Sequence, residues 1–166
     1  TFTASNETRE DGKASGKNIT ISKELSDSDL LKLWEDHLSG HQSVGIVAID
    51  EHNKCVWGAI DVDEYQLDLK DLAIKIAKQD LPLVLCRSKS GGAHIYIFLT
   101  EPILASVLQR KLRQIAASIG YGQVEIFPKQ TKLLLDRGDR GSTLNMPYFG
   151  GENSTRYAYN KKGAAM

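Results

Sequence analysis

The chain has 166 residues, of which 41% are hydrophobic and 25% charged, and its net charge is zero. This length and composition are those of one globular domain with its own core, and they exclude wholesale disorder. No apolar run approaches the roughly 18 residues that a membrane helix needs, and the polar N-terminus has no signal-peptide pattern, so we expect no membrane partner. Because Thr1 is not a start methionine, we expect a fragment that lacks flanking domains.

Residues 1–17 are polar and predict a mobile N-terminal arm, which leaves residues 18–166 as the domain. A helix is expected over residues 27–38, where Ser26 and Asp29 resemble a capping box and apolar residues recur at helical spacing. Two apolar runs, 44–49 and 54–62, flank a short polar turn and predict a β-hairpin.

The middle of the chain alternates between strand and helix patterns. Strands are expected over residues 55–62, 83–87, 93–99 and 123–127, and helices over residues 68–80 and 105–118. This β-α-β-β-α-β order predicts an α+β fold with an RRM-like (ferredoxin-like) core. The helix and hairpin before it form an N-terminal extension, and short strand-like pieces in residues 132–160 form a small C-terminal β segment. In this topology the first and third strands are adjacent, the fourth pairs with the first, and the helices cover one face.

Period-two alternation places four polar residues on the face opposite the helices, namely Asp61, Asp63, His94 and Glu125. The aromatic residues Tyr96, Phe98 and Phe127 are expected close by. Clustered carboxylates repel one another unless a cation binds, and a set of oxygen donors without thiolates suits Mg²⁺ or Mn²⁺. Two aspartates two residues apart on a strand are typical of sites that present carboxylates to a metal pair. The alternative is that Asp61, Val62 and Asp63 form a solvated strand edge.

A glycine-containing turn precedes the third strand. Gly91 and Gly92 would let backbone N–H groups approach a phosphate, and the neighbouring candidates for nucleotide binding are Arg87, Lys89, Ser90 and His94. An ordinary hairpin with an exposed histidine fits the same residues. The spacing is not that of a Walker A motif.

The second half of the chain is basic. Residues 1–83 contain 9 Lys and Arg against 16 Asp and Glu, and residues 84–166 contain 12 against 5, which gives charges of −7 and +7. A basic half suits a polyanionic partner, although folding would also intermix the charges. Within this half, Lys129, Arg140 and Asn145 are candidates for DNA binding.

The two cysteines and the three other histidines show no metal-binding pattern, so no zinc site is expected. Cys55 and Cys86 lie in apolar runs and predict buried, reduced thiols, which fits a cytoplasmic protein. The other histidines, His37, His41 and His52, are expected at the surface or in loops.

Four runs of sequence together resemble the archaeo-eukaryotic primase superfamily, most closely its primase-polymerase branch from phages, plasmids, mobile elements and CRISPR- or conflict-associated systems. The runs are Ala59–Asp63, Arg87–Tyr96, Val124–Gln130 and Leu144–Pro147, and the resemblance covers roughly residues 18–160. Many members have aspartate at the position of Glu125. The resemblance implies that residues 18–166 are a catalytic domain for DNA priming or primer extension in replication, repair or defence.

The resemblance also implies the parts of the site. Asp61, Asp63 and Glu125 would bind two Mg²⁺ or Mn²⁺ ions, and His94 would contact the phosphates of a dNTP or NTP, with Ser90 and the two glycines shaping the loop. A DNA template and primer would be the partners. The residues by themselves leave two alternatives open: a non-catalytic, RRM-like single-strand binder that stacks bases on Tyr96, Phe98 and Phe127, and a nuclease or glycosyltransferase that uses the D-x-D pair.

Overall fold

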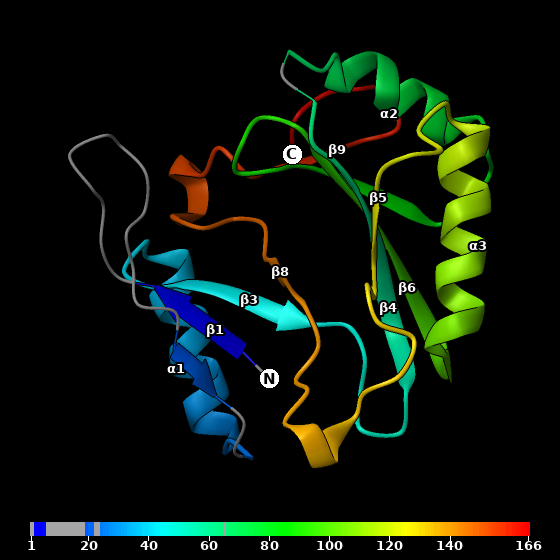
Figure 1. The fold of residues 1–166 in the computed structure, drawn as a ribbon. Helices are drawn as coiled ribbons and strands as arrows, with labels where there is room; N and C mark the ends of the chain where they lie inside the picture. Colours follow the sequence, from blue (N-terminus) through cyan, green and yellow to red (C-terminus); the bar gives the residue numbers. More distant parts are fainter. Residues whose placement is uncertain (1, 6–18, 22–23, 65) are drawn as a thin grey trace.

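Residues 2–5, 19–21, 24–64 and 66–166 are described by the computed structural model. These residues form an α+β fold with three α-helices and two antiparallel sheets (Figure 1). The smaller sheet has the order β2-β1-β3-β8, with strands β1 Phe2–Ser5, β2 Ile19–Ile21, β3 Ser43–Val47 and β8 Thr143–Asn145. The larger sheet has the order β7-β4-β6-β5-β9, with strands β4 Lys54–Val62, β5 Leu83–Arg87, β6 Ala93–Leu104, β7 Glu125–Phe127 and β9 Ala158–Tyr159.

The three helices begin and end where local chemistry dictates. In α1, Asp27–Leu38, the Ser26 hydroxyl accepts a hydrogen bond from the Asp29 N–H at 3.2 Å, and the Asp29 carboxylate accepts one from the Ser26 N–H at 3.3 Å. This reciprocal pair is the capping box that the sequence predicts. The N-cap of α2, Leu69–Ala77, is simpler: the Asp68 carboxylate accepts a hydrogen bond from the Asp71 N–H at 2.9 Å. The third helix, α3, spans Ala105–Ser118, and Gly120 follows it with a φ of +95°.

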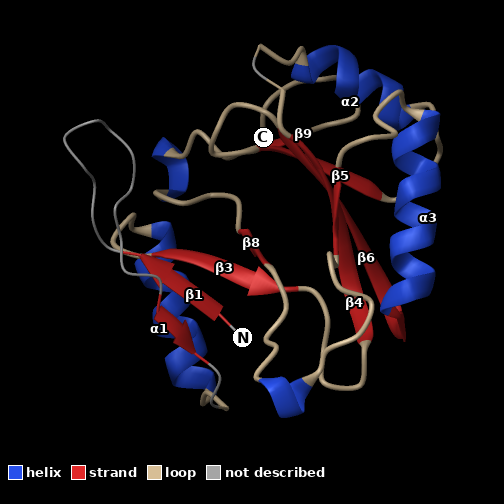
Figure 2. Ribbon diagram, viewed as in Figure 1, coloured by secondary structure: helices blue, strands red, loops and turns tan. Residues whose placement is uncertain are grey.

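Helices α2 and α3 cover one face of the larger sheet and form the main core (Figure 2). Ile60 and Ile95, at 0% exposure, point into this layer and meet Leu72 and Leu112 from the helices. Fully burying one such side chain stabilises the fold by about 1.5–3 kcal/mol. The expected neighbours are confirmed: β4 pairs with β6 on one side and with β7 on the other, both antiparallel.

The opposite face of the larger sheet is partly covered, although the sequence predicts that it is open. Figure 2 shows β8 and β3 facing this side of the sheet. A second buried cluster lies there, in which Tyr96 and Phe127 of the larger sheet pack with Leu144 of β8 and Ala158 of β9. The sheet is therefore enclosed by helices on one side and by the smaller sheet on part of the other.

The predicted hairpin over residues 44–62 is wrong. The turn exists, because the Asp50 carboxylate accepts hydrogen bonds from the N–H groups of His52 and Lys54. However, β3 pairs with β1 and β8, whereas β4 belongs to the other sheet. The turn between the two strands instead contacts a later part of the chain: the Leu133 N–H donates to the Asn53 side chain at 2.7 Å.

Several boundaries differ from those expected. Strand β6 continues to Leu104 rather than ending at 99, β7 begins at Glu125 rather than at 123, and α2 is shorter than residues 68–80. Phe2–Ser5 of the expected arm forms a strand, and the rest of that arm lies outside the described residues. None of the described helices has the length and apolar character needed to cross a membrane.

Candidate active site

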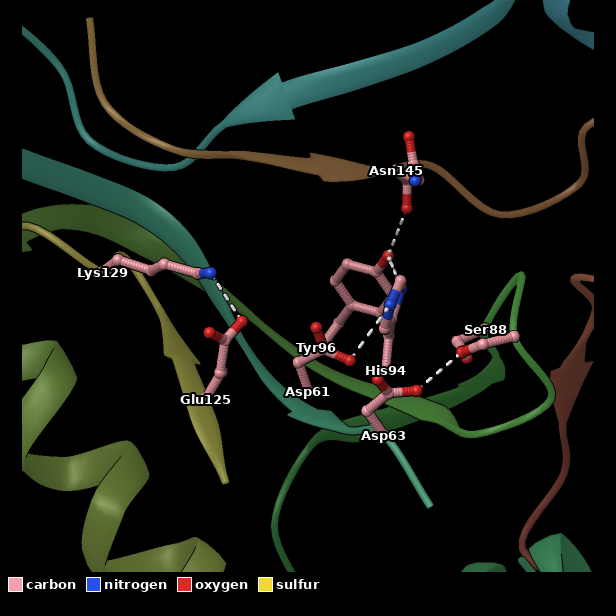
Figure 3. A network of polar contacts seen from close by, with 9 residues as sticks. Asp61, Asp63, Ser88, His94, Tyr96, Glu125, Lys129 and Asn145 are labelled. Carbon is pink, nitrogen blue, oxygen red and sulfur yellow. Dashed lines mark hydrogen bonds and ion pairs between the residues drawn. The ribbon is translucent and has the colours of Figure 1, made fainter. Parts of the chain in front are cut away.

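The acidic side chains are gathered by strand register. Asp61 of β4 lies directly opposite His94 of β6 on one side and opposite Glu125 of β7 on the other. Directly opposed residues of an antiparallel pair point to the same face with Cβ atoms about 4.5–5.5 Å apart. The structure therefore brings Asp61, His94 and Glu125 onto one face, as Figure 3 shows.

A chain of polar contacts links Asp61 to the smaller sheet. The Asp61 Oδ1 atom lies 3.4 Å from His94 Nε2, and His94 Nδ1 lies 3.1 Å from the Tyr96 hydroxyl. That hydroxyl donates to the backbone carbonyl of Asn145 on β8 at 3.2 Å (Figure 3). The Asp61 side chain is 20% exposed and that of His94 is 10% exposed, so solvent reaches only the outer edge of the pair.

Asp63 follows the end of β4 and contacts the glycine-containing turn. Its Oδ1 accepts a hydrogen bond from Ser90 Oγ at 2.9 Å, and Ser90 Oγ lies 3.1 Å from Ser88 Oγ. The turn is closed by a hydrogen bond from the Ser88 N–H to the Gly92 carbonyl. Gly91 has a φ of +96°, a conformation that favours glycine. Asp63 is therefore hydrogen-bonded directly to the glycine-containing turn.

The two cationic candidates of the turn differ in their surroundings. Arg87 is half-buried, and its Nη1 donates to the Thr155 carbonyl at 3.2 Å, so the guanidinium also holds the C-terminal segment in place. Lys89 is exposed. Of the two, Lys89 presents its charge to solvent beside the turn.

Glu125 is turned toward Lys129. The carboxylate lies 2.5 Å from the Lys129 ammonium, which is also 5.0 Å from the centre of the Phe127 ring. The Glu125 side chain is 61% exposed, so a rotation into solvent meets little steric resistance. Lys129 therefore neutralises the third carboxylate in this conformation.

The three carboxylates supply the oxygen donors that a divalent cation binds, and they lie near the same end of β4. In their present side-chain conformations, however, they do not converge on one point. Carboxylate oxygens are what Mg²⁺ and Mn²⁺ prefer. In the part of the chain that the structure describes, no three acidic, histidine or cysteine side chains are grouped closely enough to hold a metal ion. Each of the three carboxylates instead contacts a protein partner: His94, Ser90 or Lys129. Asp61 and Glu125 are nevertheless opposed in register, so both side chains leave the sheet on the same face.

The other candidates for DNA binding are dispersed. The Asn145 side chain is exposed on β8, and only its backbone joins the polar chain described above. Arg140 lines a cavity of about 440 Å³ together with Lys54 and Trp57, and none of the three carboxylates lines that cavity. The acidic residues that line this cavity with Arg140 are Asp50, Glu51 and Asp139.

The predicted aromatic stacking surface is wrong for two of its three members. Tyr96 is 2% exposed and Phe127 is 3% exposed, whereas Phe98 is 58% exposed. The two buried rings pack in one cluster with Leu144 of the smaller sheet and Ala158 of β9. Only Phe98 is accessible to a base, which weakens the hypothesis of a non-catalytic single-strand binder.

Sequence reasoning also misjudged His37. It is fully buried, accepts a hydrogen bond from the Val44 N–H on Nδ1 and contacts the Pro147 carbonyl through Nε2 at 2.8 Å. It thus joins α1 to β3 and to the turn after β8. Burial lowers the pKa of His37. The helical spacing that places His37 three residues after Trp34 was the available signal.

The two cysteines are free and buried, as predicted. Burial raises the pKa of Cys55 to about 11 and that of Cys86 to about 12. Both thiols therefore stay protonated at neutral pH and behave as small apolar side chains.

A sequence model of the archaeo-eukaryotic primase domain of the TOTE conflict system matches residues 5–158. The matched region contains strands β4, β5, β6 and β7 of the larger sheet and every candidate residue described above. The chain therefore belongs to the archaeo-eukaryotic primase family, in its conflict-system type. Membership in this family indicates a primase-like nucleotidyltransferase. No protein of curated function matches the sequence.

Proposed function

We propose that this domain is a DNA primase-polymerase, which transfers a nucleotide from a dNTP or NTP to a primer 3′-hydroxyl on a DNA template. The observation that carries the proposal is the register of β4. It sets Asp61 between His94 and Glu125, while Asp63 at the end of the same strand contacts the glycine-containing turn. Carboxylates that could bind cations thus lie next to a glycine-containing turn whose backbone could bind phosphates. Nucleotidyl transfer requires both kinds of group at one site.

The strand order supports an RRM-like catalytic core. Numbered within the predicted β-α-β-β-α-β unit, the strands β7-β4-β6-β5 follow the order 4-1-3-2, and α2 and α3 are its two connecting helices. We propose this unit as the core, with β9 added at one edge. The smaller sheet then serves as a partial cover over the site.

Two Mg²⁺ or Mn²⁺ ions are the proposed cofactors, with Asp61, Asp63 and Glu125 as their ligands. Bound there, the ions would activate the primer 3′-hydroxyl and neutralise charge on the triphosphate. Asp61 would at the same time hold the His94 ring, which it faces at 3.4 Å. His94, Lys89 and the turn amides would contact the phosphates of the incoming nucleotide.

Lys129 would exchange partners during this process. In the present conformation it is paired with Glu125. When Glu125 rotates toward Asp61, the ammonium loses its carboxylate and becomes available to a DNA phosphate. Lys129 is therefore the strongest of the three candidates for contact with DNA, followed by Asn145 at the edge of β8 and Arg140 in its separate cavity. The free, buried thiols fit a reaction in the cytoplasm.

A primer-extension assay tests the proposal. A labelled primer on a longer template is incubated with dNTPs and Mn²⁺ or Mg²⁺, using the wild type, Asp61→Asn and the control Asp71→Asn. Asp71 is an exposed residue of α2, on the other side of the sheet, where it pairs with Lys75. We expect lengthening by the wild type and by the control, and loss of at least about a hundredfold in rate for Asp61→Asn, in line with removal of a metal ligand.

The outcomes separate the candidate functions. Equal lengthening by Asp61→Asn and the wild type contradicts the assignment of Asp61. Shortening of the labelled primer identifies a nuclease instead. Oligonucleotide binding that needs no metal and is accompanied by no lengthening favours the single-strand binder.

A further inference from the structure

The hydroxyl of Tyr96 is the point at which the polar chain from Asp61 crosses from the larger sheet to the smaller sheet. Tyr96 is 2% exposed, and its oxygen contacts His94 Nδ1 on β6 and the Asn145 carbonyl on β8 (Figure 3). The ring itself has two aromatic neighbours, with ring centres 6.0 Å away for Trp57 and 6.1 Å away for Phe98. Phenylalanine would make the same ring contacts, so the hydroxyl serves hydrogen bonding rather than packing.

The direction of each hydrogen bond follows from the chemistry of the partners. A backbone carbonyl can only accept, so the one proton of the Tyr96 hydroxyl is directed at Asn145. The phenol oxygen is then an acceptor toward His94, and Nδ1 must be the donor. Burial raises the pKa of Tyr96, so the phenol keeps this proton. The ring of His94 is thereby oriented with Nε2 toward Asp61, where the nucleotide phosphates are proposed to bind.

We infer that Tyr96 is a positioning residue for nucleotide binding: its hydroxyl, anchored to the Asn145 backbone of β8, holds His94 with a proton on Nδ1 and with Nε2 facing the catalytic side. This inference rests on the proposed function of His94. It also gives the smaller sheet a part in the site, because β8 supplies the fixed acceptor. The Asn145 side chain takes no part in it.

The first test needs no enzymatic activity. In ¹⁵N-labelled protein without added metal, the imidazole nitrogen signals of His94 show which nitrogen carries the proton, and a His94→Asn sample assigns them among the four histidines. We expect Nδ1 of the wild type to be protonated. In Tyr96→Phe, Nδ1 loses its acceptor, and we expect its signal to shift toward that of the unprotonated form. Asn145→Ala keeps the carbonyl and is expected to leave the signals unchanged.

The second test is kinetic and uses the primer-extension assay. Removal of one buried hydrogen bond that orients His94 is expected to raise the nucleotide KM of Tyr96→Phe about five- to tenfold, with a smaller change in the KM for primer–template. The control Tyr121→Phe removes a hydroxyl outside the network, and we expect it to keep the wild-type KM.

Three results would overturn the inference. One is a wild-type His94 whose proton resides on Nε2 alone. Another is a Tyr96→Phe protein with unaltered His94 signals, because any kinetic loss would then be structural. The third is an unchanged nucleotide KM in an active Tyr96→Phe enzyme. If the wild type extends no primer at all, the proposed function fails while the signals still decide the orientation of His94.

Discussion

Gly58 lies in the middle of β4, where both α3 and β7 pack against the strand. A Cβ atom at this position would lie 2.7 Å from the Phe127 carbonyl oxygen, 2.8 Å from Leu112 Cδ1 and 2.9 Å from Leu108 Cδ2. Carbon atoms in van der Waals contact are about 3.5–4.0 Å apart. Gly58→Ala therefore requires the backbone of β7 at Phe127 to move and the side chains of Leu108 and Leu112 on α3 to shift, each by several tenths of an ångström.

The cost of this movement can be estimated from overpacked cores, in which one added methyl typically costs about 1–3 kcal/mol. For a domain of this size, about 2 kcal/mol corresponds to a fall in Tm of roughly 4–8 °C. Because β7 carries Glu125 opposite Asp61, we also expect slower primer extension by the protein that remains folded.

Thermal unfolding followed by circular dichroism measures the effect, with Gly122→Ala as the matched control. A Cβ atom at Gly122 would lie 3.8 Å from Ala117 Cβ, which is ordinary contact, so this variant should unfold at the wild-type temperature or slightly above it. If Gly58→Ala also retains the wild-type Tm, the close packing of α3 on β4 is not as described.

Two further predictions follow from buried titratable groups. The pKa of His37 is lowered by burial, so the unfolded chain binds more protons than the folded chain below about pH 6.5. The free energy of unfolding should therefore fall as the pH drops through that range. Urea titrations at several pH values should show a weaker fall for His37→Gln, whereas the control His41→Gln should behave like the wild type. The pKa of Cys86 is raised to about 12, so native protein at pH 8 should resist iodoacetamide at this thiol, whereas denatured protein should react. Rapid labelling of native Cys86 would show that β5 is more open than described.

The sequence by itself determined those features that depend on local pattern. The capping box at Ser26 and Asp29 and the apolar spacing of α3 predicted helices with correct or nearly correct ends. Period-two alternation assigned Asp61 and Glu125 to one face, and register places them opposite each other. The motif series predicted the family. These inferences succeed because a side chain's direction relative to its own backbone repeats with the period of the helix or strand.

Only the tertiary structure decided what covers each face and which strands are partners. Strand β3 pairs with β8, about a hundred residues later, although its nearest apolar neighbour in sequence is β4. Tyr96 and His37 also contact remote segments: Asn145 lies 49 residues from Tyr96, and Pro147 lies 110 residues from His37. Alternation separates one face from the other but carries no information about a covering segment. That segment is selected by the burial and hydrogen bonding of the whole chain, which is why Tyr96 and Phe127, predicted on an open surface, are part of the core.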